Sequence, residues 1–180
     1  SLSPHDGDGG ASFFASAEAL NSVYLHWLDL DRLLVGFRTV GGVPPPNGTI
    51  PSPYGGWCAG VDSCAWLGHL LSALAFATAS QKDAGLRTRS EYIIGVLSQV
   101  SRGVAKRRPE HAGWLGPAEW QDPPAGECHD SEGLYGSHKL IAGLIDQFEQ
   151  TGDARAKALA LGLASFLHRR LAPLIATRGW

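Results

Sequence analysis

Two cysteines and a histidine occur close together in the segment WCAGVDSCAWLGH. Thiolates and imidazoles are zinc ligands, so Cys58, Cys64 and His69 could belong to a metal site. Structural zinc sites use closely spaced ligand pairs, whereas five residues separate the two cysteines, and the other candidates, Cys128 and His129, are adjacent. The spacing therefore disfavours zinc. Three cysteines leave open one Cys58–Cys64 disulfide with a free thiol, or three free thiols.

A second chemistry would be acid–base catalysis by a pair of carboxylates. Spacing picks out no such pair among four acidic residues of the second long loop and one on a predicted inner helix, which are Glu119, Glu127, Asp130, Glu132 and Asp146. The sequence alone reveals no catalytic dyad. A lone histidine on an apolar helix, such as His69, is more often a core residue than a ligand.

Apolar periodicity predicts that helices carry these residues. Asp29, Asp83 and Asp153 each precede an apolar stripe and are predicted N-caps, as are Ser137 and either Asp62 or Ser63. The helix that begins near residue 63 is apolar or small nearly all round, which predicts that it is buried. The predicted helices cover about residues 13–28, 29–37, 63–79, 83–100, 137–148 and 153–171, and Pro173 is expected to disturb the end of the last one.

The helical pattern repeats after about 70 residues. LGHLLSALAFATASQKDAGL and GSHKLIAGLIDQFEQTGDARA share a small residue, a histidine, an apolar helix, a short turn with Asp and a second helix. Helical hairpins that cannot bury their faces alone form solenoids or closed toroids. Buried inner helices alternating with amphipathic outer helices favour an all-α fold, a partial (α/α)6 barrel (helical toroid) built from repeated helical hairpins.

The repeat also predicts where a site would lie. Turns within hairpins are short and loops between hairpins are long, so the long loops meet where inner helices begin. His69, in the second helical turn, and His138, in the first, should lie at that end. Histidines and aromatic rings around one mouth suit a neutral polar ligand such as a sugar, although the aromatics could equally pin the loops onto the bundle. The loop aromatics are Tyr54, Trp57, Trp114, Trp120 and Tyr135.

Composition limits the other classes. The net charge is −2 and the short basic run at residues 106–108 suits a helix end, so no nucleic-acid partner is expected. No apolar run reaches the roughly 20 residues of a membrane span, so no membrane partner is expected. The absence of methionine predicts a fragment, a processed product or an incomplete gene model. Asn47-Gly48-Thr49 is a glycosylation sequon that would matter in a secreted protein, but the localisation stays unknown.

Five motifs together resemble glycoside hydrolase family 127, the β-L-arabinofuranosidase-like proteins. YLHWLDLDRLLVGFR, YGGW, LGHLLSALA, GWL and YGSHKLIAGLIDQFEQTGD are similar to the family's motifs in order and spacing, over residues 24–171. The resemblance implies an (α/α)6 barrel with accessory β-sandwich domains. It makes residues 1–180 the N-terminal part of the catalytic domain, with the remainder of the barrel and the β-sandwich domains absent.

The resemblance also implies a function. Family members remove non-reducing-end β-L-arabinofuranose with retention, through a zinc-bound cysteine nucleophile and a glutamate acid/base. The matching sugar-contacting residues here are His69 and His138, with Trp57 and Tyr135 at neighbouring motif positions. The partner would be an arabinose-containing glycan.

Departures from the family pattern limit this expectation. Cys58 stands where the family has Glu, and Cys64-Ala65 replaces a family Gly-His. The family's zinc ligands lie on later helices, so we expect no catalytic residue and no bound zinc in this chain. It would supply part of the sugar pocket, be inactive alone and self-associate through its exposed half-barrel surface. The alternative is a non-catalytic carbohydrate-binding or helical-repeat interaction module.

Overall fold

The computed structural model describes residues 13–56, 63–120 and 131–178. Within these ranges it contains α-helices, short 3-10 turns and no β-strand. The predicted all-α class is therefore confirmed. The helices are α1 (Phe13–Trp27), α2 (Leu30–Leu33), α3 (Val35–Gly41), α4 (Ser63–Gln81), α5 (Ala84–Arg107), α6 (Ser131–Thr151) and α7 (Ala154–Arg178), with a 3-10 turn at Pro109–His111.

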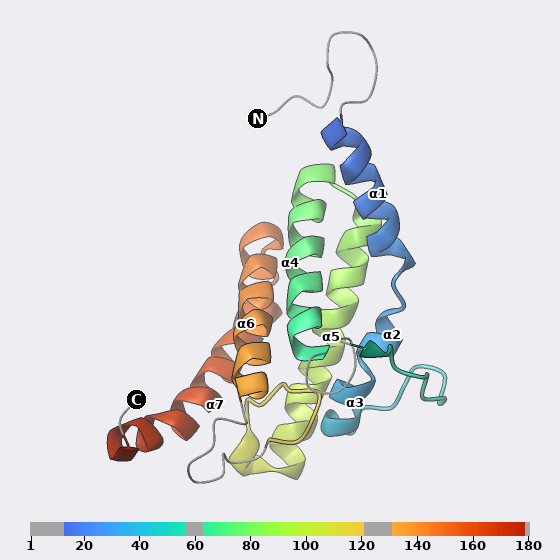
Figure 1. Ribbon diagram of the computed structural model, residues 1–180. Coiled ribbons are helices and arrows are strands. Elements are labelled where there is room, and N and C mark those ends of the chain that lie inside the picture. The colour runs from blue at the N-terminus through green and yellow to red at the C-terminus, as the bar shows by residue number, and fades with distance from the viewer. Residues whose placement is uncertain (1–12, 57–62, 121–130, 179–180) are drawn as a thin grey trace.

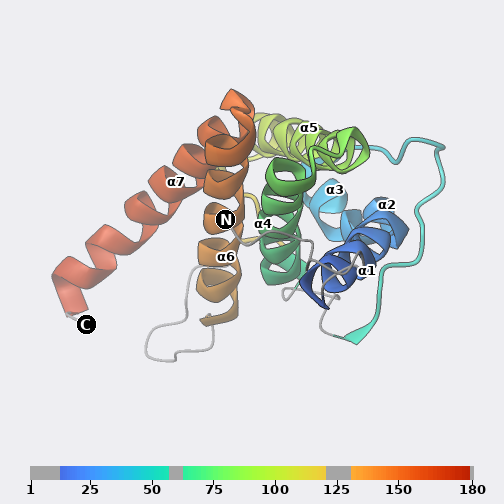
Figure 2. The same cartoon turned by 90° about the horizontal axis from the view of Figure 1, so that it is seen from above.

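Two helical hairpins, α4–α5 and α6–α7, form the body of the molecule (Figure 1). The inner helices α4 and α6 lie side by side and run in the same direction, and α5 and α7 return along the other side. Seen from above, α7 diverges from the bundle towards its C-terminal end (Figure 2). This arrangement confirms a partial helical barrel built from repeated hairpins.

Aspartates begin the second helix of each hairpin, as predicted. Asp83 Oδ1 accepts hydrogen bonds from the backbone N–H groups of Gly85 at 2.7 Å and Leu86 at 3.2 Å. Asp153 Oδ1 accepts one from the N–H of Arg155 at 2.9 Å. Asp29 does the same for α2. These caps satisfy N–H groups that a helix start leaves unpaired, and so they fix where each helix begins.

The core lies between the inner and outer helices. Apolar side chains of α4 and α5 interleave there with those of α2 and α3, and α6 and α7 extend the same layer. The fully buried members include Phe37, Leu67, Leu70, Leu71, Leu74, Leu86, Ile93, Ile94, Leu97, Leu140, Leu144 and Phe166.

Two local predictions are wrong. Helix α6 begins at Ser131, so Ser137 is a buried residue inside the helix and not its cap. Helix α7 continues through Pro173 to Arg178, past its predicted end near residue 171. Because this stretch of α7 is largely solvent-accessible, water can bind the carbonyl that proline leaves unpaired.

The predicted all-round burial of α4 is also wrong. His69 is exposed and Phe76 is 53% exposed. Helix α4 packs against α5 and α6, whereas α1 meets it mainly near its C-terminal end. One face of α4 therefore has no neighbour in the described part of the chain.

Helix α7 is the one described helix long and apolar enough to cross a membrane, over Ala154–Thr177. The same criterion is met by packed helices of proteins that never enter a membrane, so this is weak evidence. In the structure α7 packs Ala156, Leu159, Leu163 and Phe166 against the other helices. The absence of a membrane partner stays a prediction.

Candidate sugar-binding face

The inner helices touch each other at two glycines. A Cβ atom at Gly68 would lie 2.3 Å from the carbonyl oxygen of Lys139, and a Cβ at Gly143 would lie 2.2 Å from that of Gly68. Any side chain at either position would push α4 and α6 apart, so only glycine permits this approach. His69 directly follows Gly68, and His138 directly precedes Lys139. The contact therefore brings the two histidine positions to the same level of the bundle.

Both histidines are exposed on the side that faces away from α5 and α7. On α4, Leu67, Leu70 and Leu74 point into the core, so His69 points the opposite way. On α6, Leu140 and Leu144 are buried, and His138 again lies on the other side. We call this surface the open face. It comprises His69, Ala73 and Phe76 of α4 with Tyr135, His138, Ala142 and Ile145 of α6.

Tyr135 and His138 form a compact pair on α6. Their ring centroids are 5.1 Å apart in an edge-to-face arrangement, and Lys139 Nζ lies 5.4 Å from the centroid of the Tyr135 ring. Tyr135 is 53% exposed. Such a group can hydrogen-bond hydroxyls through the imidazole and the phenol, and it can present a ring to an apolar sugar face.

The remaining predicted site residues are only partly accounted for. Trp57 and Cys58 lie outside the described residues, as do Cys128 and His129. The described residues contain no group of three or more His, Cys, Asp and Glu side chains that could hold a metal ion. The described residues therefore do not fit a zinc site.

A family model for the β-L-arabinofuranosidase GH127 catalytic domain matches residues 10–178. The chain belongs to this family. No curated protein matches it closely enough to be compared with it. Membership shows a glycoside-hydrolase-type domain of the arabinofuranosidase class and a carbohydrate as its substrate class.

In this GH127 chain the motif at residues 24–38 positions Tyr54, the first residue of YGGW. The N–H of Asp29 donates a 3.0 Å hydrogen bond to the hydroxyl of Tyr54. The guanidinium of Arg32 lies 4.1 Å from the centroid of the Tyr54 ring, and its Nε donates to the carbonyl of Ser52 at 2.8 Å. The motif thus holds the side chain of Tyr54 and the backbone just before YGGW.

A second network holds the other end of the same loop. Arg38, only 7% exposed, donates to Asp31 Oδ1 at 3.0 Å and to the carbonyl of Pro44 at 3.0 Å. The Tyr92 hydroxyl donates to Asp31 Oδ1 at 2.5 Å, and burial together with this hydrogen bond raises the pKa of Tyr92. Sequence reasoning missed these positioning roles. The signal was the dense Asp and Arg pattern at residues 29–38.

The aromatics of the second long loop do not reach the open face. Trp114 and Trp120 are buried, with ring centroids 5.0 Å apart, and both pack on Phe166 of α7. Of the two interpretations offered for the loop aromatics, these two tryptophans follow the second, because they pin the loop onto the helices. Tyr135, predicted in this loop, belongs to α6 instead.

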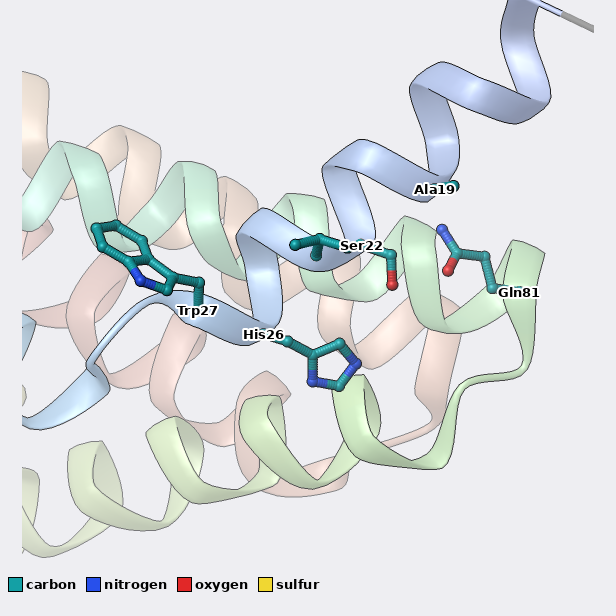
Figure 3. A pocket seen from close by; sticks show the side chains of 6 residues that line it. Ala19, Ser22, His26, Trp27 and Gln81 are labelled. Atoms are coloured by element: carbon teal, nitrogen blue, oxygen red, sulfur yellow. The ribbon is translucent and has the colours of Figure 1, made fainter.

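Two cavities border α1. One of 580 Å³ lies between α1 and α4, and its lining includes Ala73 and Phe76, so it continues the open face. The other, of 630 Å³, is lined by Ala19, Ser22, Val23, His26, Trp27 and Gln81 (Figure 3). Beside it, His26 Nε2 lies 3.0 Å from Asp83 Oδ2, which lowers the pKa of Asp83. Gln81 is 12 residues along α4 from His69, roughly 18 Å, so this second cavity is separate from the histidine pair.

Proposed function

We propose that the chain forms one wall of the sugar pocket of a retaining β-L-arabinofuranosidase. Two observations support this: the family match, and the contact at Gly68 that places His69 and His138 side by side on an uncovered face. His69, His138 and Tyr135 contact the sugar, and Trp57 lies at the neighbouring motif position.

The side chains of the open face suit a neutral sugar. Imidazole and phenol groups pair with hydroxyls as donor or acceptor, and the rings of Phe76 and Tyr135 offer apolar surface beside them. In retaining hydrolysis a nucleophile and an acid/base act on opposite sides of the glycosidic bond. We assign neither role to this chain. The resemblance places both, with the zinc ligands, on helices beyond this repeat.

Binding tests the pocket directly. Titration of methyl β-L-arabinofuranoside, followed by histidine ring NMR signals, should perturb His69 and His138. His69→Ala and His138→Ala should each weaken binding by roughly tenfold, because each removes one hydrogen bond from the bound sugar. His168→Ala is the matched control, since His168 is exposed on the outer helix α7 and should leave binding unchanged. Unchanged affinity in both pocket variants would refute the assignment.

Activity and binding measurements distinguish the glycosidase proposal from a non-catalytic carbohydrate-binding module. We expect no hydrolysis of an aryl β-L-arabinofuranoside by these 180 residues and no tight zinc binding in equilibrium dialysis. Turnover by the chain alone would contradict this. Tighter binding of another sugar class, abolished by the same two substitutions, would favour a non-catalytic carbohydrate-binding module.

The open face also carries a prediction about association. Phe76 is 53% exposed and Ile145 is 42% exposed, beside the aromatic pair on α6. Uncovered apolar surface of this kind promotes self-association. Sedimentation should detect dimers or larger species, and a Phe76→Ser, Ile145→Ser double variant should shift the chain towards monomer.

A further inference from the structure

The loop between α3 and α4 carries a chemically specific sequence that the sugar site does not use. Asn47-Gly48-Thr49 places a hydroxyl two residues after an asparagine, with Gly between them and Ile50 after them. Transfer of an N-linked glycan requires this spacing and the absence of proline between the two residues.

The structure presents this sequence at the tip of an anchored loop. The N–H of Gly48 donates a 3.2 Å hydrogen bond to the carbonyl of Pro45, and Gly48 has φ 70°, so the chain turns at Asn47. Asn47 and Thr49 are exposed, and neither side chain forms a hydrogen bond within the described part of the molecule. The Asn47 amide and the Thr49 hydroxyl, which a glycosyltransferase must bind, are therefore accessible.

The anchors lie outside the sequon. Arg38 holds the carbonyl of Pro44, and Arg32 holds that of Ser52. Within the described residues no hydrogen bond or ion pair ties residues 46–50 to a helix, so the tip can enter a transferase site without breaking the bonds that anchor the loop. Figures 1 and 2 both show the loop on the side of α2 and α3, away from α6, so a glycan there would not crowd His138.

We propose that Asn47 is an N-glycosylation acceptor and that the chain meets a secretory-pathway glycosyltransferase. The donor is a polyprenyl-pyrophosphate-linked oligosaccharide. The Asn47 Nδ2 atom forms a bond to C1 of the first N-acetylglucosamine. The C1–O bond to pyrophosphate breaks, the lipid pyrophosphate leaves, and Nδ2 loses one proton.

An apolar surface close to Asn47 in the sequence offers a side chain on which the first sugar can pack. Ile50 is 66% exposed, three residues from Asn47. It borders a 290 Å³ cavity whose lining also includes Val43, Pro44, Pro45 and Pro51. We expect the first sugar, fixed to the loop tip, to lie over Ile50 and to remove this exposed apolar side chain from water.

Secretion from eukaryotic cells behind a cleavable signal tests the acceptor. Intact mass should show one glycan, removed by peptide-N-glycosidase. Asn47→Gln and Thr49→Ala should each abolish it, and Asn21→Gln should retain it, because Asn21 is the other asparagine of the chain and lies outside any sequon. Thr49→Ser keeps the hydroxyl and should remain glycosylated. A folded, secreted chain without glycan, or a glycan that survives Thr49→Ala, would overturn the proposal.

Thermal unfolding tests the packing of the first sugar. Trimming the glycan to a single N-acetylglucosamine should leave Tm unchanged, whereas full removal should lower Tm by roughly 2–4 °C. In an Ile50→Ser variant this difference should vanish. Equal Tm for the trimmed and fully deglycosylated chains would exclude packing on Ile50 while leaving the attachment intact.

Discussion

The two long loops differ in the contacts that dominate them. The first, after α3, is fixed by guanidinium groups that bind backbone carbonyls: Arg38 to Pro44 and Arg32 to Ser52. The second, after α5, has one such bond, from Arg169 to Ala112, but it is fixed mainly by Trp114 and Trp120, which pack on the fully buried Phe166.

This difference follows from what each loop must do. The first loop leads into the YGGW turn at the predicted sugar-binding end, and hydrogen bonds fix its direction while leaving its tip in water. The second loop packs on the middle of α7, around the buried Phe166. Directional bonds therefore dominate in the first loop, and apolar burial dominates in the second.

The largest loss of stability should come from removing the aromatic packing that holds the second loop. Phe166→Ala removes the ring on which both tryptophans rest and leaves a cavity, so the free energy of unfolding should fall by about 3–5 kcal/mol. Urea unfolding followed by tryptophan fluorescence measures this loss. Leu161→Ala, at an exposed position of the same helix, is the control and should change stability by less than about 1 kcal/mol.

Arg38→Met should have the next largest effect. It removes the charge that pairs with Asp31 and the donor to Pro44, while keeping most of the side-chain volume. We expect a loss of roughly 2 kcal/mol, less than for a fully buried pair, because the side chain of Asp31 is 32% exposed.

The same variant should also loosen the first loop. Hydrogen exchange should rise around residues 42–56 and stay unchanged at residues 112–120. Arg102→Met, at an exposed position of α5, should be nearly neutral. Equal exchange changes in both loops would contradict the separation of the two mechanisms.

Tyr92→Phe removes a single hydroxyl from the same hydrogen-bond network. It deletes the hydroxyl that donates to Asp31 and accepts from Arg38 at 2.8 Å, and leaves the ring in place. The expected loss in free energy of unfolding is about 1 kcal/mol. Chemical denaturation measures it, and a double variant with Arg38→Met should lose less than the sum of the two single losses.

The smallest effect is expected at alkaline pH, where the first-loop network should lose the stability that depends on the Tyr92 proton. Burial and the hydrogen bond to Asp31 raise the pKa of Tyr92 above its usual value of about 10. The folded state therefore holds this proton more tightly than the unfolded state. The resulting stability is present below the unfolded pKa and is lost as pH rises through the folded pKa. Unfolding curves between about pH 8 and 11 should show this loss in the parent chain and not in Tyr92→Phe.

Much of the fold was predictable because it rests on local signals. Asp83 and Asp153 cap helices through their own neighbours, and the short turns after α4 and α6 lie where the sequence puts them. The internal repeat predicts that His69 and His138 lie in equivalent helices. Local hydrogen bonding and helical periodicity are properties of the sequence itself.

The failed predictions all depended on neighbours. Ser137 has the chemistry of a cap, but α6 extends beyond it and buries it. Trp114 and Tyr135 both read as loop aromatics, yet one is in the core and the other is on an exposed helix face. An apolar stripe indicates which side of a helix favours burial, but not whether another element covers that side.

The sequence is enough to predict most of the helices, the aspartate caps, the repeat and the family motifs, because these depend on contacts a few residues apart. Tertiary structure alone decided which faces are covered and how closely α4 and α6 approach. Gly68 and Gly143 are ordinary helix residues in the sequence. Only their packing shows that they bring His69 and His138 together, because the missing side chains matter solely where another backbone comes within contact distance.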